Sequence, residues 1–352
     1  MKILFYVREN HKTVKGGDLI QIYKTADALK RHGLNITFSS DPRADLSKYE
    51  LIHIFNSPRF EETKKFFENA KKFKKPIAFS TIYWSKDELA VGIAKNRSVN
   101  FVYKNFGIGA AKRYRKIAKK IQSIGNKESF EKIEKHLFKS ADILLPNSKG
   151  EMLEIEKSYR LKNKFSVVRN AVDVELFHKK PAVIREDYIL SVGRIERRKN
   201  TLKLIEACNE LKYNLVLIGG YDPEDLYALN CLKKASEYNQ VHIHNIEQKD
   251  LLKYYYGAKA HAIVSWYETP GLSSLEAACG GCNIVSTDRG STKEYFGGEA
   301  IYCDPFSAAS ISRALKKAML AAVDFKLRDK IIHKYNWDNA AKDTIKGYKR
   351  II

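Results

Sequence analysis

Two glutamates, Glu268 and Glu276, stand eight residues apart in a segment that follows an apolar run and opens a helical pattern. Between them, Gly271, Leu272 and Ser273 are expected to form the N-terminus of a helix, whose free N–H groups and partial positive charge suit a phosphate. A glycine there permits close approach of the backbone to the ligand. Glu276, about one turn into the helix, is placed to accept hydrogen bonds from two adjacent hydroxyls, as a carboxylate does with a ribose.

A second segment, residues 191–200, places cations at another junction between a strand and a helix. Arg194 and Lys199 follow Gly193 there, at a spacing that lets both side chains face the same ligand. A guanidinium and an ammonium would hold a diphosphate and stabilise the charge that builds on it as it leaves. The pattern therefore indicates a site for an activated, phosphate-linked substrate, although such a cluster standing alone is more often a solvated helix start.

The elements that position these residues are predicted to form two α/β domains, because 352 residues exceed the size at which one hydrophobic core usually stops growing. Apolar runs alternate with helical patterns, which favours parallel sheets covered by helices on both faces. We expect two doubly wound Rossmann-like domains that face each other across a cleft. The predicted strands are 2–7, 35–38, 51–55, 77–82 and 142–145, then 188–192, 215–218, 241–243, 261–264 and 283–286.

The predicted domain boundary lies where the polar, proline-containing stretch 177–181 separates the two series of strands. Residues 1–175 are expected to form an N-terminal acceptor-binding domain and residues 176–335 a C-terminal domain that binds the donor. Residues 336–352 are expected to form a helix that returns to the first domain.

Together these residues resemble the retaining glycosyltransferases of family 4, which have two Rossmann-like domains in the arrangement called GT-B. In that family the first glutamate lies near the transferred sugar and the second binds the donor ribose, which implies these roles for Glu268 and Glu276. The Gly-Arg and following Lys of the family correspond to Gly193, Arg194 and Lys199. The resemblance implies a nucleotide-sugar donor and retention of the anomeric configuration.

The resemblance extends into the first half of the chain. Gly16 and Gly17 are similar to the glycine-rich first loop that approaches the donor phosphates in the family. Many members carry a histidine after the fourth strand, where this chain has Tyr83 and Trp84. Either aromatic residue could contact a sugar or be packed in the core. His53 is the nearest remaining histidine, and we assign these three residues to the acceptor side.

The charge of the chain is strongly basic, with a formal value of +22. Such a charge draws a protein toward anionic partners. Residues 104–139 carry eleven Lys or Arg against three Glu, and Ile117, Ala118, Ile121 and Ile124 lie between them at helical spacing. This pattern favours docking on an anionic membrane surface, with packing on its own domain as the alternative. Nucleic acid is disfavoured, because no RNA-binding or helix-turn-helix signature accompanies the charge.

The chain contains five cysteines, an odd number without a repeating framework, so reduced thiols are expected. Cys279 and Cys282 have the spacing of a redox or zinc motif, but no second pair completes a metal site, and buried small residues are the favoured interpretation. No Asp-x-Asp motif occurs in the sequence. We therefore expect neither a metal nor another cofactor, because the cations of the protein would stabilise the leaving group.

The predicted function is transfer of a sugar from a nucleoside-diphosphate sugar, with UDP or GDP as the nucleotide, to an acceptor hydroxyl in cell-surface polysaccharide or glycolipid synthesis. The acceptor is expected to be a carbohydrate or a lipid-linked molecule. The absence of a long apolar run predicts a cytoplasmic protein, peripheral on the inner face of the membrane. The alternatives are a nucleotide-sugar epimerase or phosphorylase, an NAD-dependent enzyme, disfavoured because Gly-x-Gly-x-x-Gly is absent after the first strand, and a non-catalytic basic protein.

Overall fold

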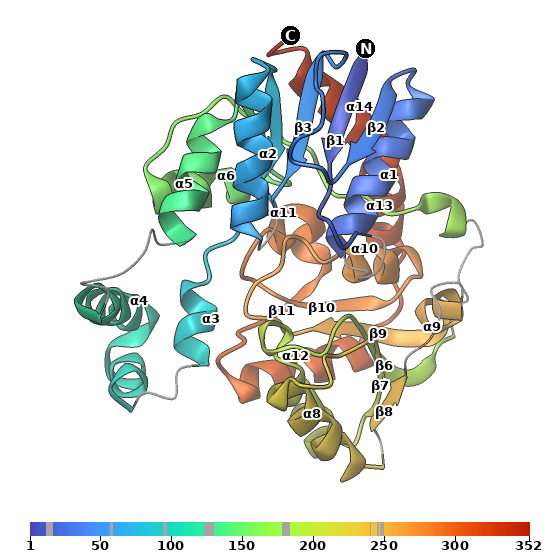
Figure 1. Cartoon of the computed structure of the whole chain (residues 1–352). Coiled ribbons are helices and arrows are strands. Elements are labelled where there is room, and N and C mark those ends of the chain that lie inside the picture. Colours follow the sequence, from blue (N-terminus) through green and yellow to red (C-terminus); the bar gives the residue numbers. More distant parts are fainter. Residues whose placement is uncertain are drawn as a thin grey trace. The chain divides into compact units, whose positions relative to one another are not determined.

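The structure is a computed structural model in which contacts divide the chain into two compact units (Figure 1). The first unit contains Met1–Trp84, Lys127–Val172 and His333–Ile352, and the second contains Ser85–Asn126 and Asp173–Ile332. Within these ranges, the structure describes residues 1–11, 17–56, 59–93, 97–122, 130–177, 184–239, 241–244, 246 and 250–352.

The first unit is built on a five-stranded parallel sheet in the order β2-β1-β3-β4-β5. Its strands are β1 (Lys2–Tyr6), β2 (Asn35–Ser39), β3 (Leu51–Phe55), β4 (Ile77–Ser80) and β5 (Ile143–Leu145). Its helices are α1 (Gly17–Arg31), α2 (Phe60–Lys72), α5 (Phe130–Ser140), α6 (Lys149–Tyr159) and α14 (Trp337–Tyr348).

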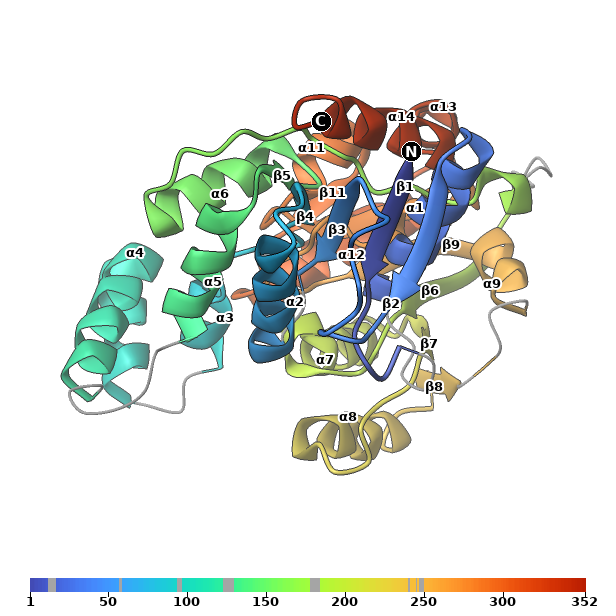
Figure 2. The same ribbon diagram turned by 45° about the horizontal axis from the view of Figure 1, so that its top comes forward.

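Side chains of this sheet alternate between two cores, as the pleat of a strand requires. Ile3 and Phe5 of β1 belong to the core that α1 and α14 cover. Leu4 and Tyr6 belong to the opposite core, which α2 and α5 cover. Figure 2 shows α5 beside α2, and α14 packs against α1. The continuous apolar sequence of β1 is therefore explained by burial on both faces.

The second unit is built on a six-stranded parallel sheet in the order β11-β10-β9-β6-β7-β8. Its strands are β6 (Glu186–Val192), β7 (Asn214–Ile218), β8 (Val241–His244), β9 (Ala258–Ile263), β10 (Asn283–Thr287) and β11 (Ile301–Cys303). Its helices are α3 (Asp87–Gly92), α4 (Arg97–Gln122), α7 (Thr201–Leu211), α8 (Leu226–Ser236), α9 (Leu251–Gly257), α10 (Leu272–Cys279), α11 (Thr292–Phe296), α12 (Ala308–Leu320) and α13 (Lys326–Lys334), which continues into the first unit.

Both sheets are doubly wound, which confirms the predicted fold class. Numbered from its own first strand, the second sheet has the order 3-2-1-4-5-6 read from the β8 edge, the arrangement of dinucleotide-binding domains. In the first sheet the order changes direction between β1 and β3. The short strand β11 was not predicted from the sequence.

Residues 85–126 belong to the second unit, whereas the sequence placed them in the N-terminal domain. Three contacts explain this grouping. The ring of Tyr103 lies 4.7 Å from that of Phe306, measured between centroids. Glu88 accepts a hydrogen bond of 2.8 Å from Arg289 Nε. Gly92 lies so close to Trp266 that a Cβ atom there would stand 2.2 Å from the indole ring.

The basic segment falls mainly on α4, which is interrupted at Gly107, where φ is 78°. Ile117, one residue of the predicted apolar stripe, is exposed and therefore is not packed in the core of the second unit. Among the residues that the structure describes, no helix combines the length and apolar character needed to cross a membrane. The side chains of Ala118 and Ile121, and all of Ile124, lie outside the described residues.

Candidate active site

The candidate site lies in the second unit, at the carboxyl ends of two adjacent strands. β6 and β9 are hydrogen-bonded neighbours, and the strand order of the sheet reverses between them. The loop after β6 carries Gly193 to Lys199, and the loop after β9 carries Glu268. Ligands of doubly wound sheets bind at this kind of switch point, because the loops from the two strands diverge there.

The carboxylate of Glu268 is the centre of this site. Its Oε1 atom accepts hydrogen bonds from Lys199 Nζ at 2.7 Å, Ser265 Oγ at 2.6 Å and Arg198 Nη1 at 3.1 Å. The residue is only 4% exposed. Burial would raise the pKa of Glu268, but the charges of Lys199 and Arg198 outweigh this effect and hold its pKa at about 2. Glu268 is therefore an anion at neutral pH.

The cations around Glu268 respond differently to burial. Burial lowers the pKa of Lys199, and the charge of Glu268 offsets only part of this effect. For Arg198, burial also favours the neutral form, but Glu268 and Glu196 together raise its pKa. Removal of the Glu268 carboxylate would leave two partly buried cations without this shared partner, which is costly in a region of low dielectric.

The backbone of Glu268 is held by the loop after β10. The N–H of Glu268 donates to the carbonyl oxygen of Arg289 at 3.2 Å, and its carbonyl accepts from the N–H of Ser291 at 2.8 Å. Gly290 lies between these partners at a φ of 93°, and a Cβ atom there would stand 1.9 Å from the carbonyl oxygen of Glu268. Only glycine allows this close approach.

The helix α10 begins next to the same carboxylate. Gly271 precedes it at a φ of 92°, and a Cβ atom on Gly271 would lie 3.4 Å from Glu268 Oε2. Leu272 and Ser273 are the first residues of the helix, as predicted. The first N–H groups of a helix have no acceptor within it, and they carry the positive end of the helix dipole. The arrangement thus provides anion-binding amides beside two cations.

Glu276 lies one turn into α10 and is partly exposed. Its Oε2 atom accepts a hydrogen bond of 2.7 Å from the hydroxyl of Tyr255, a buried residue of α9. Burial raises the pKa of Glu276 to about 7; the Tyr255 hydrogen bond acts against this shift, and Asp173 adds to it. The carboxyl group therefore changes its protonation state near neutral pH.

The loop after β6 is fixed by glycine and by one asparagine. Gly193 has a φ of 149°, and a Cβ atom on Gly219, after the neighbouring strand, would stand 2.2 Å from the carbonyl oxygen of Gly193. The side-chain amide of Asn200 donates to the carbonyl oxygens of Val264 and Pro305, each at 3.2 Å. Asn200 therefore ties the loop after β6 to the loop after β9.

Arg194 is not among the side chains that donate hydrogen bonds to Glu268. Arg194 is exposed, whereas Lys199 is brought to the glutamate and Arg198 joins it. Four residues of the site did not emerge from the sequence: Arg198, Ser265, Tyr255 and His261. Arg198 was visible as part of a basic run, but no spacing rule shows which of three consecutive cations turns inward.

His261 lies on β9 beneath this cluster and is fully buried. Neither of its ring nitrogens has a hydrogen-bond partner among the described residues. Burial lowers its pKa to about 3, and the nearby charge of Lys199 acts in the same direction. The ring is therefore neutral and does not compete with Lys199 for the carboxylate of Glu268.

The residues predicted on the acceptor side lie in the first unit, and two of them are buried. His53 is 1% exposed, and its two ring nitrogens pair with Tyr348 Oη at 2.6 Å and Ser80 Oγ at 2.8 Å. Burial lowers its pKa to about 3. Because both nitrogens are engaged inside the core, the geometry argues against contact between His53 and an acceptor, and a structural role replaces the predicted one.

Tyr83 is also a core residue, with its ring 5.5 Å from that of Phe138 and 5.6 Å from that of Tyr159, measured between centroids. Burial raises its pKa to about 12. Of the two alternatives for Tyr83, a packed aromatic is therefore the one observed. Trp84 is partly exposed, and Gly17 is exposed at the start of α1. Gly16 lies outside the described residues.

All five cysteines are buried free thiols. Burial raises the pKa values of Cys279 and Cys282 to about 12 in each case. A thiol is nucleophilic and binds metals as its thiolate, so these two side chains are held in the unreactive form. The geometry fits the interpretation of both residues as small buried side chains, with Cys279 as the last residue of α10 and Cys282 shortly after it.

The fold and the site define a doubly wound protein that gathers a buried carboxylate, two cations and the start of a helix at the switch point of its second sheet. Residues 173–335 match the family model described as "Glycosyl transferases group 1". The match covers the whole second unit apart from residues 85–126.

Curated relatives align with about half of the chain. A 4-alpha-N-acetylgalactosaminyltransferase of Campylobacter jejuni, whose name specifies a diphospho-undecaprenol-linked substrate, is 32% identical over 177 residues, 46% of each chain. An uncharacterized glycosyltransferase of Methanocaldococcus jannaschii is 29% identical over 47% of this chain and 45% of its own. The aligned stretch thus spans about half the length of these relatives.

Solved structures resemble the chain over its full length. Sucrose-phosphate synthase from Thermosynechococcus elongatus aligns over 99% of this chain and 98% of its own, with a TM-score of 0.77 and 17% identity. The Anabaena protein HepE, solved with UDP and glucose, aligns over 99% of both chains with a TM-score of 0.70 and 14% identity. At such identities the likeness shows the fold, and the predicted GT-B fold class is confirmed.

Proposed function

We propose that the chain is a glycosyltransferase that moves a sugar from a nucleoside-diphosphate sugar to an acceptor hydroxyl. The observation that carries this proposal is the meeting of Lys199 and Arg198 with Glu268 beside the N-terminus of α10. An anion-binding helix end, fixed cations and a buried carboxylate are what transfer of a phosphate-linked sugar needs at one point. The match of residues 173–335 to the group 1 family model supports the proposal.

The diphosphate of the donor would be held by the first amides of α10 and by Lys199. As the bond from the sugar to the phosphate breaks, negative charge builds on the leaving oxygen. Preformed cations and amides stabilise this charge without reorganising, which is the larger part of such catalysis. Arg194, exposed and five residues before Lys199, would approach the diphosphate from the outer side of the loop.

Glu268 would bind the hydroxyls of the transferred sugar. Its low pKa and its three hydrogen-bond donors on Oε1 keep it ionised, so it is not a general acid. Gly271 brings the start of α10 close to Oε2. A sugar hydroxyl donating to this carboxylate would be fixed relative to the helix end that holds the phosphate.

Glu276 would accept hydrogen bonds from the two ribose hydroxyls of the nucleotide. The hydroxyl of Tyr255 already donates to Oε2 and orients the carboxylate. A bidentate contact requires the ionised form, because a protonated carboxyl loses an acceptor site. We therefore assign the ribose to the partly exposed side of Glu276.

Retention of the anomeric configuration is proposed from the resemblance to family 4. In the front-face route that the resemblance implies, the leaving phosphate oxygen helps to remove the proton of the acceptor hydroxyl as the new bond forms. No covalent intermediate on Glu268 is needed. Product configuration, read by the one-bond C–H coupling at the anomeric carbon, distinguishes retention from inversion.

We propose a lipid-linked acceptor on an anionic membrane surface, in polysaccharide or glycolipid synthesis, and a cytoplasmic location on the inner face. Phe101, Phe106 and Ile117 of α4 are each more than three-fifths exposed, beside Arg113 and Arg115. Exposed apolar side chains flanked by cations suit the boundary of an anionic bilayer. Sedimentation with vesicles tests this: binding should require anionic lipid and should weaken in F106S.

A transfer assay tests the proposed activity. The protein is incubated with UDP-, GDP- or ADP-sugars, with and without an acceptor, and release of the nucleoside diphosphate is measured. A transferase releases nucleotide in proportion to glycosylated acceptor. A changed sugar in incubations with donor alone would instead indicate an epimerase, and failure to bind any nucleotide would leave the non-catalytic alternative.

A further inference from the structure

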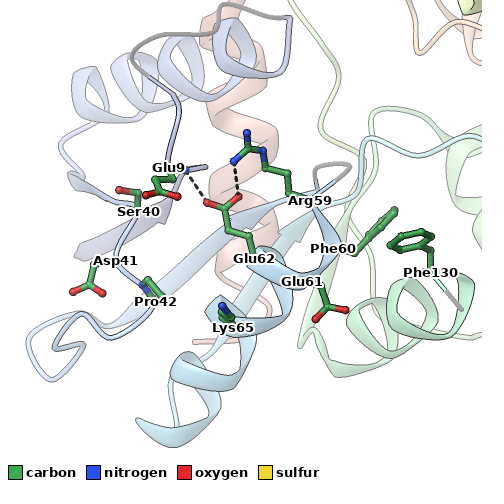
Figure 3. Close-up of a pocket in the computed structure, with 10 residues that line it drawn as sticks. All are labelled: Glu9, Ser40, Asp41, Pro42, Arg59, Phe60, Glu61, Glu62, Lys65 and Phe130. Atoms are coloured by element: carbon green, nitrogen blue, oxygen red, sulfur yellow. Dashed lines mark hydrogen bonds and ion pairs between the residues drawn. The ribbon is translucent and has the colours of Figure 1, made fainter. Parts of the chain in front are cut away.

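A hollow of about 750 Å³ opens at the carboxyl edge of the first sheet. Its walls come from the loops after β1 and β2, from the start of α2 after β3, and from the start of α5 (Figure 3). This volume falls in the usual range of small-molecule sites, about 300 to 1,000 Å³. The acidic hollow, as we name it, is lined by Glu9, Ser40, Asp41, Pro42, Arg59, Phe60, Glu61, Glu62, Lys65 and Phe130.

The position of the acidic hollow is a second reason to consider it a ligand site. The strand order of the first sheet changes direction between β1 and β3, and the residues after these two strands line the hollow. Doubly wound sheets bind ligands at this point. The same rule located the cluster around Glu268 in the second unit.

The charge of the acidic hollow is opposite to that of the whole chain. Four carboxylates and two cations line it, a formal charge of −2 in a chain of +22. One cation, Arg59, is already 4.0 Å from the carboxylate of Glu62, which also accepts a hydrogen bond of 2.7 Å from the N–H of Glu9. Asp41 and Glu61 are exposed. An anionic group would therefore meet repulsion here.

Two phenyl rings form an apolar side of the acidic hollow. The centroids of Phe60 and Phe130 lie 5.7 Å apart, and Phe130 is 68% exposed. Figure 3 shows the two rings side by side, with Glu61, the residue that follows Phe60 in α2, near them. Carboxylates accept hydrogen bonds from hydroxyls, and the negative face of an aromatic ring attracts the polarised C–H groups of a sugar.

A buried side-chain amide beside the acidic hollow has an oxygen that can accept a hydrogen bond. Asn56 is 8% exposed, and its Oδ1 atom has no hydrogen-bond partner among the described residues. It lines a small adjoining hollow that shares Glu62 as a wall. A buried carbonyl oxygen without a donor is costly, and a ligand hydroxyl reaching past Glu62 would satisfy it.

We propose that the acidic hollow binds an uncharged sugar ring, the acceptor residue of the transfer reaction, and rejects sugars that carry a carboxylate or phosphate at that ring. The identification of this sugar as the acceptor rests on the proposed function. The inference that the hollow binds a sugar is argued from its lining residues alone. Any anionic part of the acceptor, such as a lipid-linked diphosphate, must then lie outside the hollow.

Matched pairs of methyl glycosides test the proposal. Glucoside, galactoside and mannoside are compared with the corresponding uronides, which differ only by a carboxylate in place of the CH₂OH group. Binding is measured by saturation-transfer NMR on the full chain. At least one neutral glycoside should bind in the millimolar range, and its uronide should bind at least about tenfold more weakly because like charges repel.

Two variants localise the binding. F130A removes an exposed ring and should abolish binding of the neutral glycoside, measured as the loss of its saturation-transfer NMR signal. The double variant D41N/E61Q removes two exposed carboxylates and should bring the uronide to within about threefold of the neutral glycoside, since the repulsion is gone. Equal binding of both members of each pair by the unaltered protein, binding that survives F130A, or no binding of any neutral glycoside would overturn the proposal.

A nucleotide thermal shift on the same samples separates this proposal from the proposed function. Stabilisation by nucleotide reports the site around Glu268 and should be unchanged in F130A. Sugar binding without thermal stabilisation by any nucleotide would overturn the proposed transferase function and leave the acidic hollow as a sugar site. Stabilisation by nucleotide without sugar binding would overturn the sugar site and leave the proposed transferase function.

Discussion

The Nζ atom of Lys199 lies 2.7 Å from Oε1 of Glu268, although the two residues follow different strands of the second sheet. The contact is possible because β6 and β9 are adjacent and their loops leave the same edge. It joins the two segments that the sequence singled out separately. The ion pair also orients Lys199 beside the start of α10, where the diphosphate is expected.

Replacement of Lys199 by alanine should lower kcat by about 10² to 10³, because a donor to the departing diphosphate is lost. Folding should persist, since Arg198 remains paired with Glu268. R197A is the matched control, because Arg197 lies on the same turn, is exposed and is placed over the ring of Tyr227 instead. Equal losses in the two variants would show that only general charge matters. Steady-state kinetics at saturating donor make the comparison.

Nucleotide affinity should rise with pH through the pKa of Glu276. The ionised fraction of a carboxyl with a pKa of about 7 increases roughly tenfold between pH 6 and pH 8, and only this form accepts both ribose hydroxyls. Calorimetric titration should therefore give tighter binding at the higher pH. In E276Q the affinity should be weak and independent of pH, whereas E210Q, an exposed change on α7, should behave as the unaltered protein.

The same shift predicts the sign of a stability effect. The pKa of Glu276 is raised on folding, so its contribution to the free energy of unfolding is fully present below the unfolded value of 4.5 and is lost as the pH rises through about 7. Urea unfolding at several pH values should show this decline, and E276Q should lack it. An identical pH profile in the variant would refute the assignment.

Gly92 and Gly109 form a matched pair of helical glycines. A Cβ atom on Gly92 would stand 2.2 Å from the indole of Trp266, two residues before Glu268, whereas one on Gly109 meets nothing within 4 Å. G92A should destabilise the protein by about 1 to 3 kcal/mol through overpacking and should reduce kcat. G109A should be neutral or slightly stabilising, because alanine is the better helix former. Similar thermal unfolding of both variants would contradict the close contact.

Acid should destabilise the protein through His53. Its pKa is lowered from 6.5 to about 3 by burial, so the unfolded chain binds the extra proton between these values, and the free energy of unfolding falls as the pH drops through this window. The slope from this residue is about 1.4 kcal/mol per pH unit. H53Q should be less stable at pH 7 but should show a shallower acid dependence; an unchanged slope would disprove burial of the neutral ring.

Transfer should continue after removal of divalent metal, because the cations of the protein are proposed to stabilise the leaving group. Dialysis against EDTA followed by the nucleotide-release assay provides the test. Full activity is expected, with K199A as the low-activity reference. If activity is lost and is restored by added Mg²⁺ or Mn²⁺, a metal ion stabilises the leaving group instead.

The sequence predicted most of the architecture because its strands are buried on both faces and read as continuous apolar runs, such as Leu51–Phe55. It also singled out the two segments that meet at Glu268, in which Gly271 and Gly193 occupy backbone conformations that favour glycine. The sequence did not reveal hydrogen-bond partners that are far apart along the chain. The assignment of His53 failed because a hydrogen bond to Tyr348, 295 residues away, has no local signal.

The grouping of residues 85–126 with the second unit was also missed. Glu88 and Arg289 are 201 residues apart, and nothing in either neighbourhood indicates that they pair. The acidic hollow escaped for the same reason: its carboxylates are scattered over several loops, and only the fold assembles them. A strongly basic composition concealed this local excess of negative charge.

A crystal structure with a bound nucleotide sugar tests the central claim most directly. We expect the diphosphate within hydrogen-bonding distance of the first amides of α10 and of Lys199 Nζ, with both ribose hydroxyls bound by Glu276. A nucleotide bound elsewhere, or a start of α10 that stays closed to the ligand while Lys199 keeps only Glu268 as its partner, would contradict it.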